Sequence, residues 1–229
     1  MDILNLLKII TTIVTAAIAL IIGLRVLFLN KSDLLNKWFA LYFISSSLGF
    51  LIYAIYHLIL NNSDIIIPLM ITAHIFFNFN SISLPMTLFV LEKHTKIAMS
   101  LKYLGTMLIL FFIMSIGYFI SPPQVEMGDY ALGIVNTHTP PVLLIFVNAI
   151  RILIAIYAVY RYIVINRKIE GETKNRIKWF SLGVIIFLFG LVINLTGGLL
   201  SLIVMEILAL IIIDIGALLV LKGFLIKSK

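Results

Sequence analysis

The sequence contains no cysteine, which excludes disulfide bonds, thiol catalysis, iron–sulfur clusters and cysteine-based zinc sites. It is also poor in charge, because only 12% of its 229 residues are Asp, Glu, Lys or Arg, whereas soluble domains carry about 25%. A chain with so few charges cannot cover its own surface with solvated groups. This composition therefore excludes a soluble enzyme, a nucleic-acid-binding domain and a disordered tail.

Apolar residues fill the space that charge leaves. They make up 62% of the chain, and the mean hydropathy is +1.16. A helix needs about 20 apolar residues to cross the hydrocarbon core of a bilayer. Seven runs of that kind predict an all-α integral membrane protein, a bundle of seven transmembrane helices in one domain. The predicted spans are 4–29, 38–60, 68–91, 101–120, 141–165, 179–195 and 199–226.

The boundary between the last two spans depends on a glycine pair. Residues 179–226 form an apolar stretch of 48 residues, which is too long for one crossing and long enough for a tight hairpin of two. Gly197 and Gly198 are the strongest helix-breaking pair within it. The sequence therefore predicts that the sixth helix ends near residue 195 and the seventh begins near 199.

Basic residues predict the orientation, because Lys and Arg resist translocation and mark cytoplasmic loops. Of the 17 basic residues, 14 fall in or beside the first, third and fifth connections and the C-terminal end. The opposite side has only Lys8, and Arg25 and Arg151 lie within spans. The pattern predicts an outer N-terminus and a cytoplasmic C-terminus in the cell membrane. It also explains the net charge of +7 without a nucleic-acid partner, since the lipid bilayer is the expected partner.

The fifth connection, residues 166–178, is the largest and most charged inner surface. It either anchors the protein on anionic lipid headgroups or docks a cytoplasmic signalling partner. No output domain follows Ile226, so a signal would have to pass to such a partner. The candidate docking residues are Arg167, Lys168, Lys174, Arg176 and Lys178.

Polar residues inside the spans are costly and are expected to face the bundle interior. His74 and Asn78 lie four residues apart and so share one face of the third span. Arg151 lies near mid-membrane, where Asp214, or else Glu206, is its expected counter-ion. We therefore expect an intramembrane ion pair of Arg151 with Asp214, together with an outward-facing polar cavity. The candidate cavity residues are His57, His74, Asn78, Arg151, Asn194 and Glu206.

Two stretches near the fifth connection carry a family resemblance. They are Tyr160-Arg161-Tyr162 and Arg176-Ile177-Lys178-Trp179-Phe180-Ser181-Leu182-Gly183. They resemble the region around the fifth and sixth helices of the N-terminal seven-helix sensor domain of prokaryotic membrane histidine kinases. The resemblance extends loosely over the chain in helix number, orientation and loop length. It implies a sensor of the same helix count, here without the kinase module.

These observations leave three hypotheses of different classes. The first is a receptor-like sensor with the outer polar cavity, which needs neither cofactor nor catalysis. The second is a small secondary transporter or proton-coupled carrier that uses Arg151, Glu206 and Asp214 as a charge relay. The third is an intramembrane metal-dependent enzyme acting on lipid through His57, His74 and an acid. The two histidines have none of the usual metal-ligand spacings, so the composition favours the first two.

Overall fold

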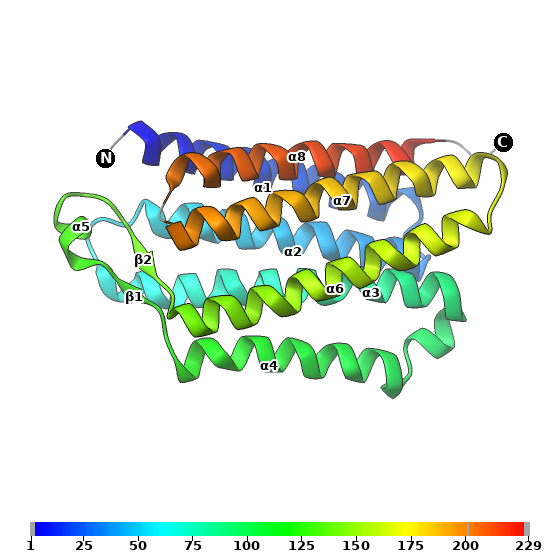
Figure 1. Ribbon diagram of the computed structural model, residues 1–229, viewed down its shortest axis with the longest axis horizontal. Coiled ribbons are helices and arrows are strands. Elements are labelled where there is room, and N and C mark those ends of the chain that lie inside the picture. The colour runs from blue at the N-terminus through cyan, green and yellow to red at the C-terminus, as the bar shows by residue number, and fades with distance from the viewer. Residues whose placement is uncertain (1–2, 201, 227–229) are drawn as a thin grey trace.

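The computed structural model describes residues 3–200 and 202–226, except for the side chains of His94 and Thr173. It forms an elongated bundle of parallel and antiparallel helices (Figure 1). The seven long helices are α1 (Ile3–Leu29), α2 (Leu34–His57), α3 (Ile66–Ala98), α4 (Thr106–Ile120), α6 (Pro141–Arg167), α7 (Gly171–Leu200) and α8 (Ile203–Leu225).

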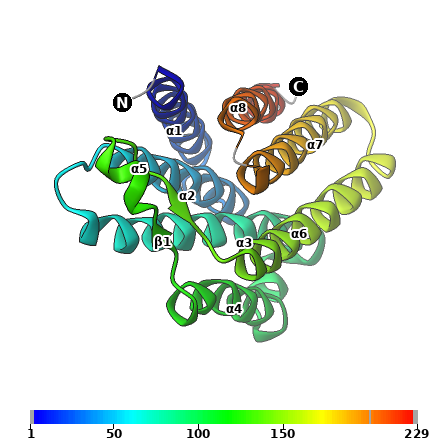
Figure 2. The same cartoon turned by 60° about the vertical axis from the view of Figure 1, so that its left-hand side comes forward.

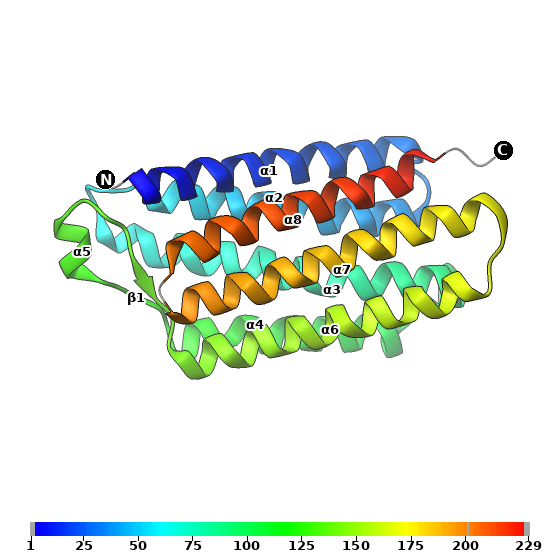
Figure 3. The same ribbon diagram turned by 45° about the horizontal axis from the view of Figure 1, so that its top comes forward.

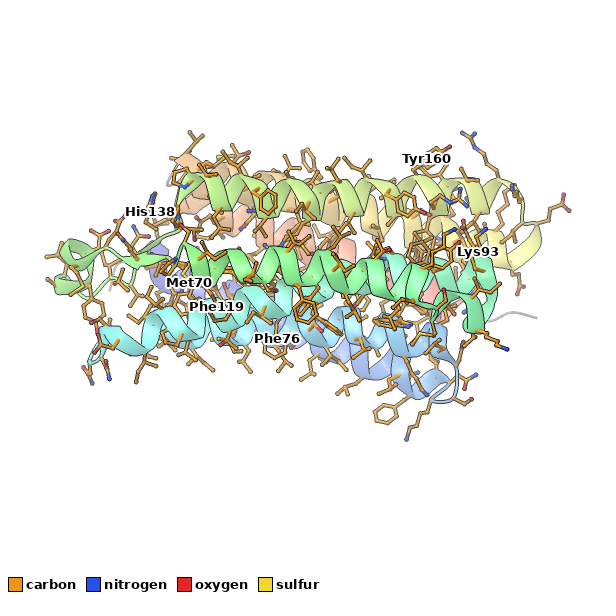
Figure 4. All side chains as sticks on the ribbon, turned by 90° about the horizontal axis from the view of Figure 1, so that it is seen from below. Met70, Phe76, Lys93, Phe119, His138 and Tyr160 are labelled. Carbon is orange, nitrogen blue, oxygen red and sulfur yellow. The ribbon has the colours of Figure 1, made fainter. Side chains whose placement is uncertain are left out.

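Within the described residues, seven helical segments are long and apolar enough to cross a membrane, which confirms the predicted number of spans. Apolar side chains point outward along the whole bundle, as contact with lipid requires (Figure 4). Phe119 on α4 and Tyr160 on α6, for example, are 63% and 61% exposed. By the length and composition of its helices, the chain is a multi-pass membrane protein.

The order of helices around the bundle follows the chain with one exception. Helices α1, α2, α3, α6, α7 and α8 form a closed ring in which each contacts the next and α8 contacts α1. Helix α4 lies outside this ring and packs against α3 and α6 (Figures 2 and 4). Aromatic side chains of α2 and α7 meet in the middle of the ring, where Phe39 packs edge-on against Phe180.

The connection between α4 and α6 is a small folded cap, which the sequence did not predict. Its strands β1 (Gln124–Val125) and β2 (Thr137–His138) pair antiparallel, and the short helix α5 (Met127–Ala131) lies between them. The cap covers the ends of α2 and α3 through a buried cluster that includes Val135 and Tyr56. Figure 3 shows it at the end of the bundle that carries the N-terminus. A three-residue 3₁₀ turn (Ser63–Ile65) precedes α3, and a π-helical turn (Leu101–Gly105) precedes α4.

The predicted break at Gly197-Gly198 is wrong. Helix α7 continues through both glycines to Leu200, and the turn to α8 follows. A Cβ atom on Gly197 would lie only 3.0 Å from the Cβ of Met205 on α8. The glycine therefore lets two helices approach closely rather than ending one of them. Within lipid the intact helix is favoured, because its backbone groups have no water to bond instead.

The predicted polar connection 166–178 is also corrected. Helix α6 ends at Arg167, and α7 begins at Gly171, so only residues 168–170 join them. Gly171 has a φ of +69°, which a residue with a side chain rarely adopts. The first two turns of α7 are amphipathic, because Ile177 packs against the core while Lys174 and Lys178 are exposed. Hydropathy alone reads such a segment as a loop.

Candidate functional site: a desolvated arginine between α3, α4 and α6

Arg151 lies roughly 15 Å along α6 from Pro141, well inside the predicted span. Its Nε donates a hydrogen bond of 3.1 Å and its Nη2 one of 2.7 Å to the same oxygen, Oδ1 of Asn78 on α3. Two longer contacts of 3.4 Å join Nη2 to the carbonyl oxygen of His74 and Nη1 to Oδ1 of Asn148. The guanidinium is thus bonded to neutral oxygens on α3 and on its own helix.

The partners of Arg151 are themselves held in place. Asn78 is completely buried, and its Nδ2 donates to Oγ of Ser115 on α4 over 3.2 Å. Asn148 donates its own Nδ2 hydrogen to the carbonyl oxygen of Leu144, one turn earlier on α6. The Asn78 oxygen therefore faces Arg151 because its amide nitrogen is used on the other side. This explains why three helices, α3, α4 and α6, meet at this level.

Aromatic rings close the other sides of the guanidinium. His74 stacks on Tyr118 of α4 with ring centroids 4.5 Å apart and ring planes 12° from parallel. The Arg151 guanidinium lies 6.0 Å from the ring centroid of Phe77. The hydroxyl of Tyr118 is buried and lies next to the Arg151 guanidinium. We call His74, Asn78, Ser115, Tyr118, Asn148 and Arg151 the arginine cluster.

The predicted ion pair of Arg151 with Asp214 is not formed. Arg151 faces α3 from α6, whereas Oδ2 of Asp214 on α8 accepts a hydrogen bond of 3.1 Å from Thr15 on α1. The ring order separates these two groups, since α7 lies between α6 and α8. The charge of Arg151 is therefore balanced by no carboxylate among the described residues. Guanidinium has five N–H hydrogens, of which the four contacts use four, and the Tyr118 hydroxyl lies beside the group.

Glu206, predicted to line the cavity or to pair with Arg151, pairs instead with Lys8 of α1. Lys8 also lies 5.3 Å from the ring centroid of Tyr53 on α2. His57 stacks close to Tyr53 and places its Nδ1 2.8 Å from the Tyr53 carbonyl oxygen, to which it donates. Lys8, Glu206, Tyr53 and His57 thus form a second group between α1, α2 and α8. In the sequence, Lys8 stands out only as the one basic residue on the side opposite the basic connections.

The six predicted cavity residues therefore fall into separate places. The structure brings His74, Asn78 and Arg151 together in the arginine cluster, and His57 and Glu206 together in the second group. Asn194 is half-buried on α7 and makes no hydrogen bond to the described residues. The six side chains therefore do not line one continuous cavity.

A narrow crevice runs beside Arg151, between α2, α3, α6 and α7. Its free space is about 20 Å³, enough for about one water molecule. Polar residues line one part of it together with Arg151, and aliphatic and aromatic side chains line the rest. The lining residues are Tyr42, Asn80, Ser81, Leu84, Arg151, Ile154, Ala155, Val184, Phe187 and Leu191.

A second charged contact joins α3 to α6 at the opposite end of these helices. Arg161 bonds both carboxylate oxygens of Glu92, with Nη2–O distances of 2.7 Å. Glu92 thus balances the charge of Arg161, whereas no carboxylate among the described residues pairs with Arg151, which lies earlier on the same helix. The predicted docking residues lie near this end. Arg167, Lys168, Lys174 and Lys178 are exposed, and Arg176 is half-buried.

The described part of the chain does not bring together the side chains of a metal site. No three side chains of His, Cys, Asp or Glu approach one another there closely enough to hold an ion. His57 and His74 lie in different clusters, each packed against tyrosine rings. The geometry therefore gives the metal-enzyme hypothesis no set of ligands.

No protein-family model, curated protein or solved structure matches this chain. The helices therefore define the class of protein, and the arginine cluster is the feature that bears on its function.

Proposed function

We propose that this protein is a receptor-like sensor of the cell membrane, which binds its ligand between its helices beside Arg151. The observation that carries the proposal is a cationic side chain inside a span with neutral partners only. A charge inside a span without a counter-ion is costly, and intramembrane ionisable residues are functional candidates for that reason. A ligand of opposite charge would remove the cost.

The signal would pass to a partner at the end of the bundle where α6 joins α7. Helix α6 carries Arg151 in its first half and the exposed Arg167 at its other end. Lys168, Lys174, Arg176 and Lys178 continue this basic surface onto α7. A displacement of α6 at the arginine cluster would therefore move the proposed docking surface. The resemblance to kinase-linked seven-helix sensors agrees with this arrangement.

The orientation that the proposal requires can be tested by labelling, since the chain has no cysteine of its own. We expect single cysteines at the exposed positions Asn61 and His138 to react with an impermeant maleimide on intact cells. A cysteine at Lys168, in the connection between α6 and α7, should react only after the membrane is permeabilised. Labelling of Lys168→Cys alone on intact cells would contradict an inner docking surface.

A carrier is the second candidate, and one observation favours it. Lys8, Thr15, Glu206 and Asp214 place charged and polar groups along the contact of α1 with α8. Oδ1 of Asp214 is buried and makes no hydrogen bond within the described residues, so it is open to bind a proton. This path excludes Arg151, so the three-residue relay expected from the sequence is not formed.

Proton flux separates the two candidates. The sensor proposal predicts that proteoliposomes under an imposed pH gradient lose it no faster than protein-free liposomes, as followed by an internal pH-sensitive dye. Asp214→Asn should then change nothing. Flux through the wild type that is abolished by Asp214→Asn would replace the sensor with a proton-conducting carrier.

A further inference from the structure

The chemistry beside Arg151 also defines a class of ligand. We propose that the crevice between α2, α3, α6 and α7 binds a long-chain carboxylate, which pairs its headgroup with Arg151 and lays its chain against the apolar lining. The inference rests on the proposed function, because it names the ligand class of the same site.

The requirement for a negatively charged ligand comes from the guanidinium of Arg151. Arg151 carries one positive charge, and the described residues bring it no carboxylate. Its two longest contacts are the 3.4 Å bonds from Nη1 to Asn148 and from Nη2 to the His74 carbonyl oxygen. A carboxylate oxygen at Nη1 would form a charge-assisted hydrogen bond, which is about twice as strong as a neutral one. One negative charge is sufficient to balance the site.

A second donor lies on the same crevice. Tyr42 of α2 lines it, and its hydroxyl makes no hydrogen bond to the described residues. The neighbouring Asn80 already donates its Nδ2 hydrogen to the Tyr42 carbonyl oxygen over 3.2 Å. Arg151 and the Tyr42 hydroxyl are thus the donors that the crevice offers an anionic headgroup, since Asn80 and Ser81 already donate to backbone carbonyl oxygens.

The apolar part of the crevice lining favours a ligand with a hydrocarbon chain. Beyond Arg151 the crevice is bounded by aliphatic and aromatic side chains, among them Leu84, Val184 and Phe187. A ligand at this depth reaches the site through lipid, where an amphiphile is already concentrated. A free inorganic anion would leave the apolar wall unused. An acyl chain would lie against it once the helices separate.

The free space of about 20 Å³ is far too small for an acyl chain, so binding must separate α6 from α7. That contact can open. Helix α7 meets α8 backbone to backbone at Gly183 and Gly216, whereas it meets α6 through side chains such as Tyr162 against Phe180. The ligand would therefore favour an open arrangement of α6 over the closed one described here.

Oleate is the probe that tests this class, with the protein in nanodiscs of zwitterionic lipid. We expect oleate to raise the thermal midpoint of the wild type by several degrees, because a ligand that binds only the folded state stabilises it. Oleyl alcohol, of the same chain length, and acetate, of the same headgroup, should each have much smaller effects. The oleate effect should disappear in the double variant Arg151→Met with Asn78→Leu.

The matched control is the other arginine of α6. In Arg161→Met with Glu92→Leu, which removes a balanced pair, the oleate shift should persist. Equal shifts by oleate and oleyl alcohol, or equal shifts in both double variants, would overturn the carboxylate proposal. A shift by acetate or chloride that requires Arg151 would overturn the long-chain class alone and leave the sensor proposal standing. Failure of the sensor proposal would appear instead as proton flux in proteoliposomes.

Discussion

Replacing Asn78 with leucine is expected to destabilise the bundle by about 2–3 kcal/mol, the range for losing a hydrogen bond to a charged group in a buried place. The substitution removes the oxygen that accepts both short hydrogen bonds of Arg151, leaving two contacts of 3.4 Å. Arg151→Met alone leaves a neutral amide and should cost less. The double variant should recover most of the loss, because a polar pair is often matched by apolar residues of similar size.

Asn80→Leu is the matched control for this cycle. Asn80 is the same residue type on the same helix, is also buried, and donates to the neutral carbonyl oxygen of Tyr42. Its replacement should cost about 1 kcal/mol. Thermal or denaturant unfolding in detergent gives the four free energies of the cycle. If Asn78→Leu costs no more than Asn80→Leu and is additive with Arg151→Met, then Arg151 does not depend on Asn78.

Gly183→Val is expected to cost about 3 kcal/mol or to prevent the α7–α8 hairpin from forming, at the upper end of what overpacking costs. A Cβ atom at this position would lie 2.5 Å from the carbonyl oxygen of Gly216 and 2.7 Å from the backbone nitrogen of Val220. Backbone atoms cannot rotate aside as a side chain can, so the two helices would have to separate. The thermal midpoint of the purified variant measures the effect.

The control for that substitution is Gly128→Val in the cap between α4 and α6. Nothing lies within 4 Å of a Cβ atom placed there, and the backbone angle is ordinary. Its effect should stay within about 0.5 kcal/mol, as for most surface changes. Equal thermal midpoints for Gly183→Val and Gly128→Val would contradict the close contact of α7 with α8.

The spans could be predicted because a bilayer fixes the length and hydropathy of each crossing, whatever the helices pack against. The turn before α8 could not, because a glycine pair such as Gly197-Gly198 has the same sequence pattern in a helix break as in a close helix contact. The start of α7 was missed for a related reason. Polar residues such as Lys174 continue a helix beyond the membrane as readily as they form a loop.

The sequence could not predict the partner of Arg151, because that partner depends on which helices are neighbours. Charge complementarity pointed to Asp214, but which helices are neighbours depends on the ring order, in which α7 separates α6 from α8. Asn78 was correctly placed on the face of α3 that turns inward, yet its rotation toward Arg151 depends on Ser115 of α4. Lys8 does carry a usable signal, because an isolated basic residue on a side whose other charges are acidic suggests a partner such as Glu206.

The most direct test of ligand-driven opening, through which the proposed sensor would signal, is a distance between α6 and α7 with and without oleate. Spin labels at the lipid-facing positions Ile163 of α6 and Leu182 of α7, on a chain that has no other cysteine, allow pulsed electron paramagnetic resonance in nanodiscs. We predict that oleate shifts the distance distribution to longer values, and that the double variant Arg151→Met with Asn78→Leu shows no shift. Identical distributions with and without oleate, at concentrations that raise the thermal midpoint of the wild type, would contradict the account.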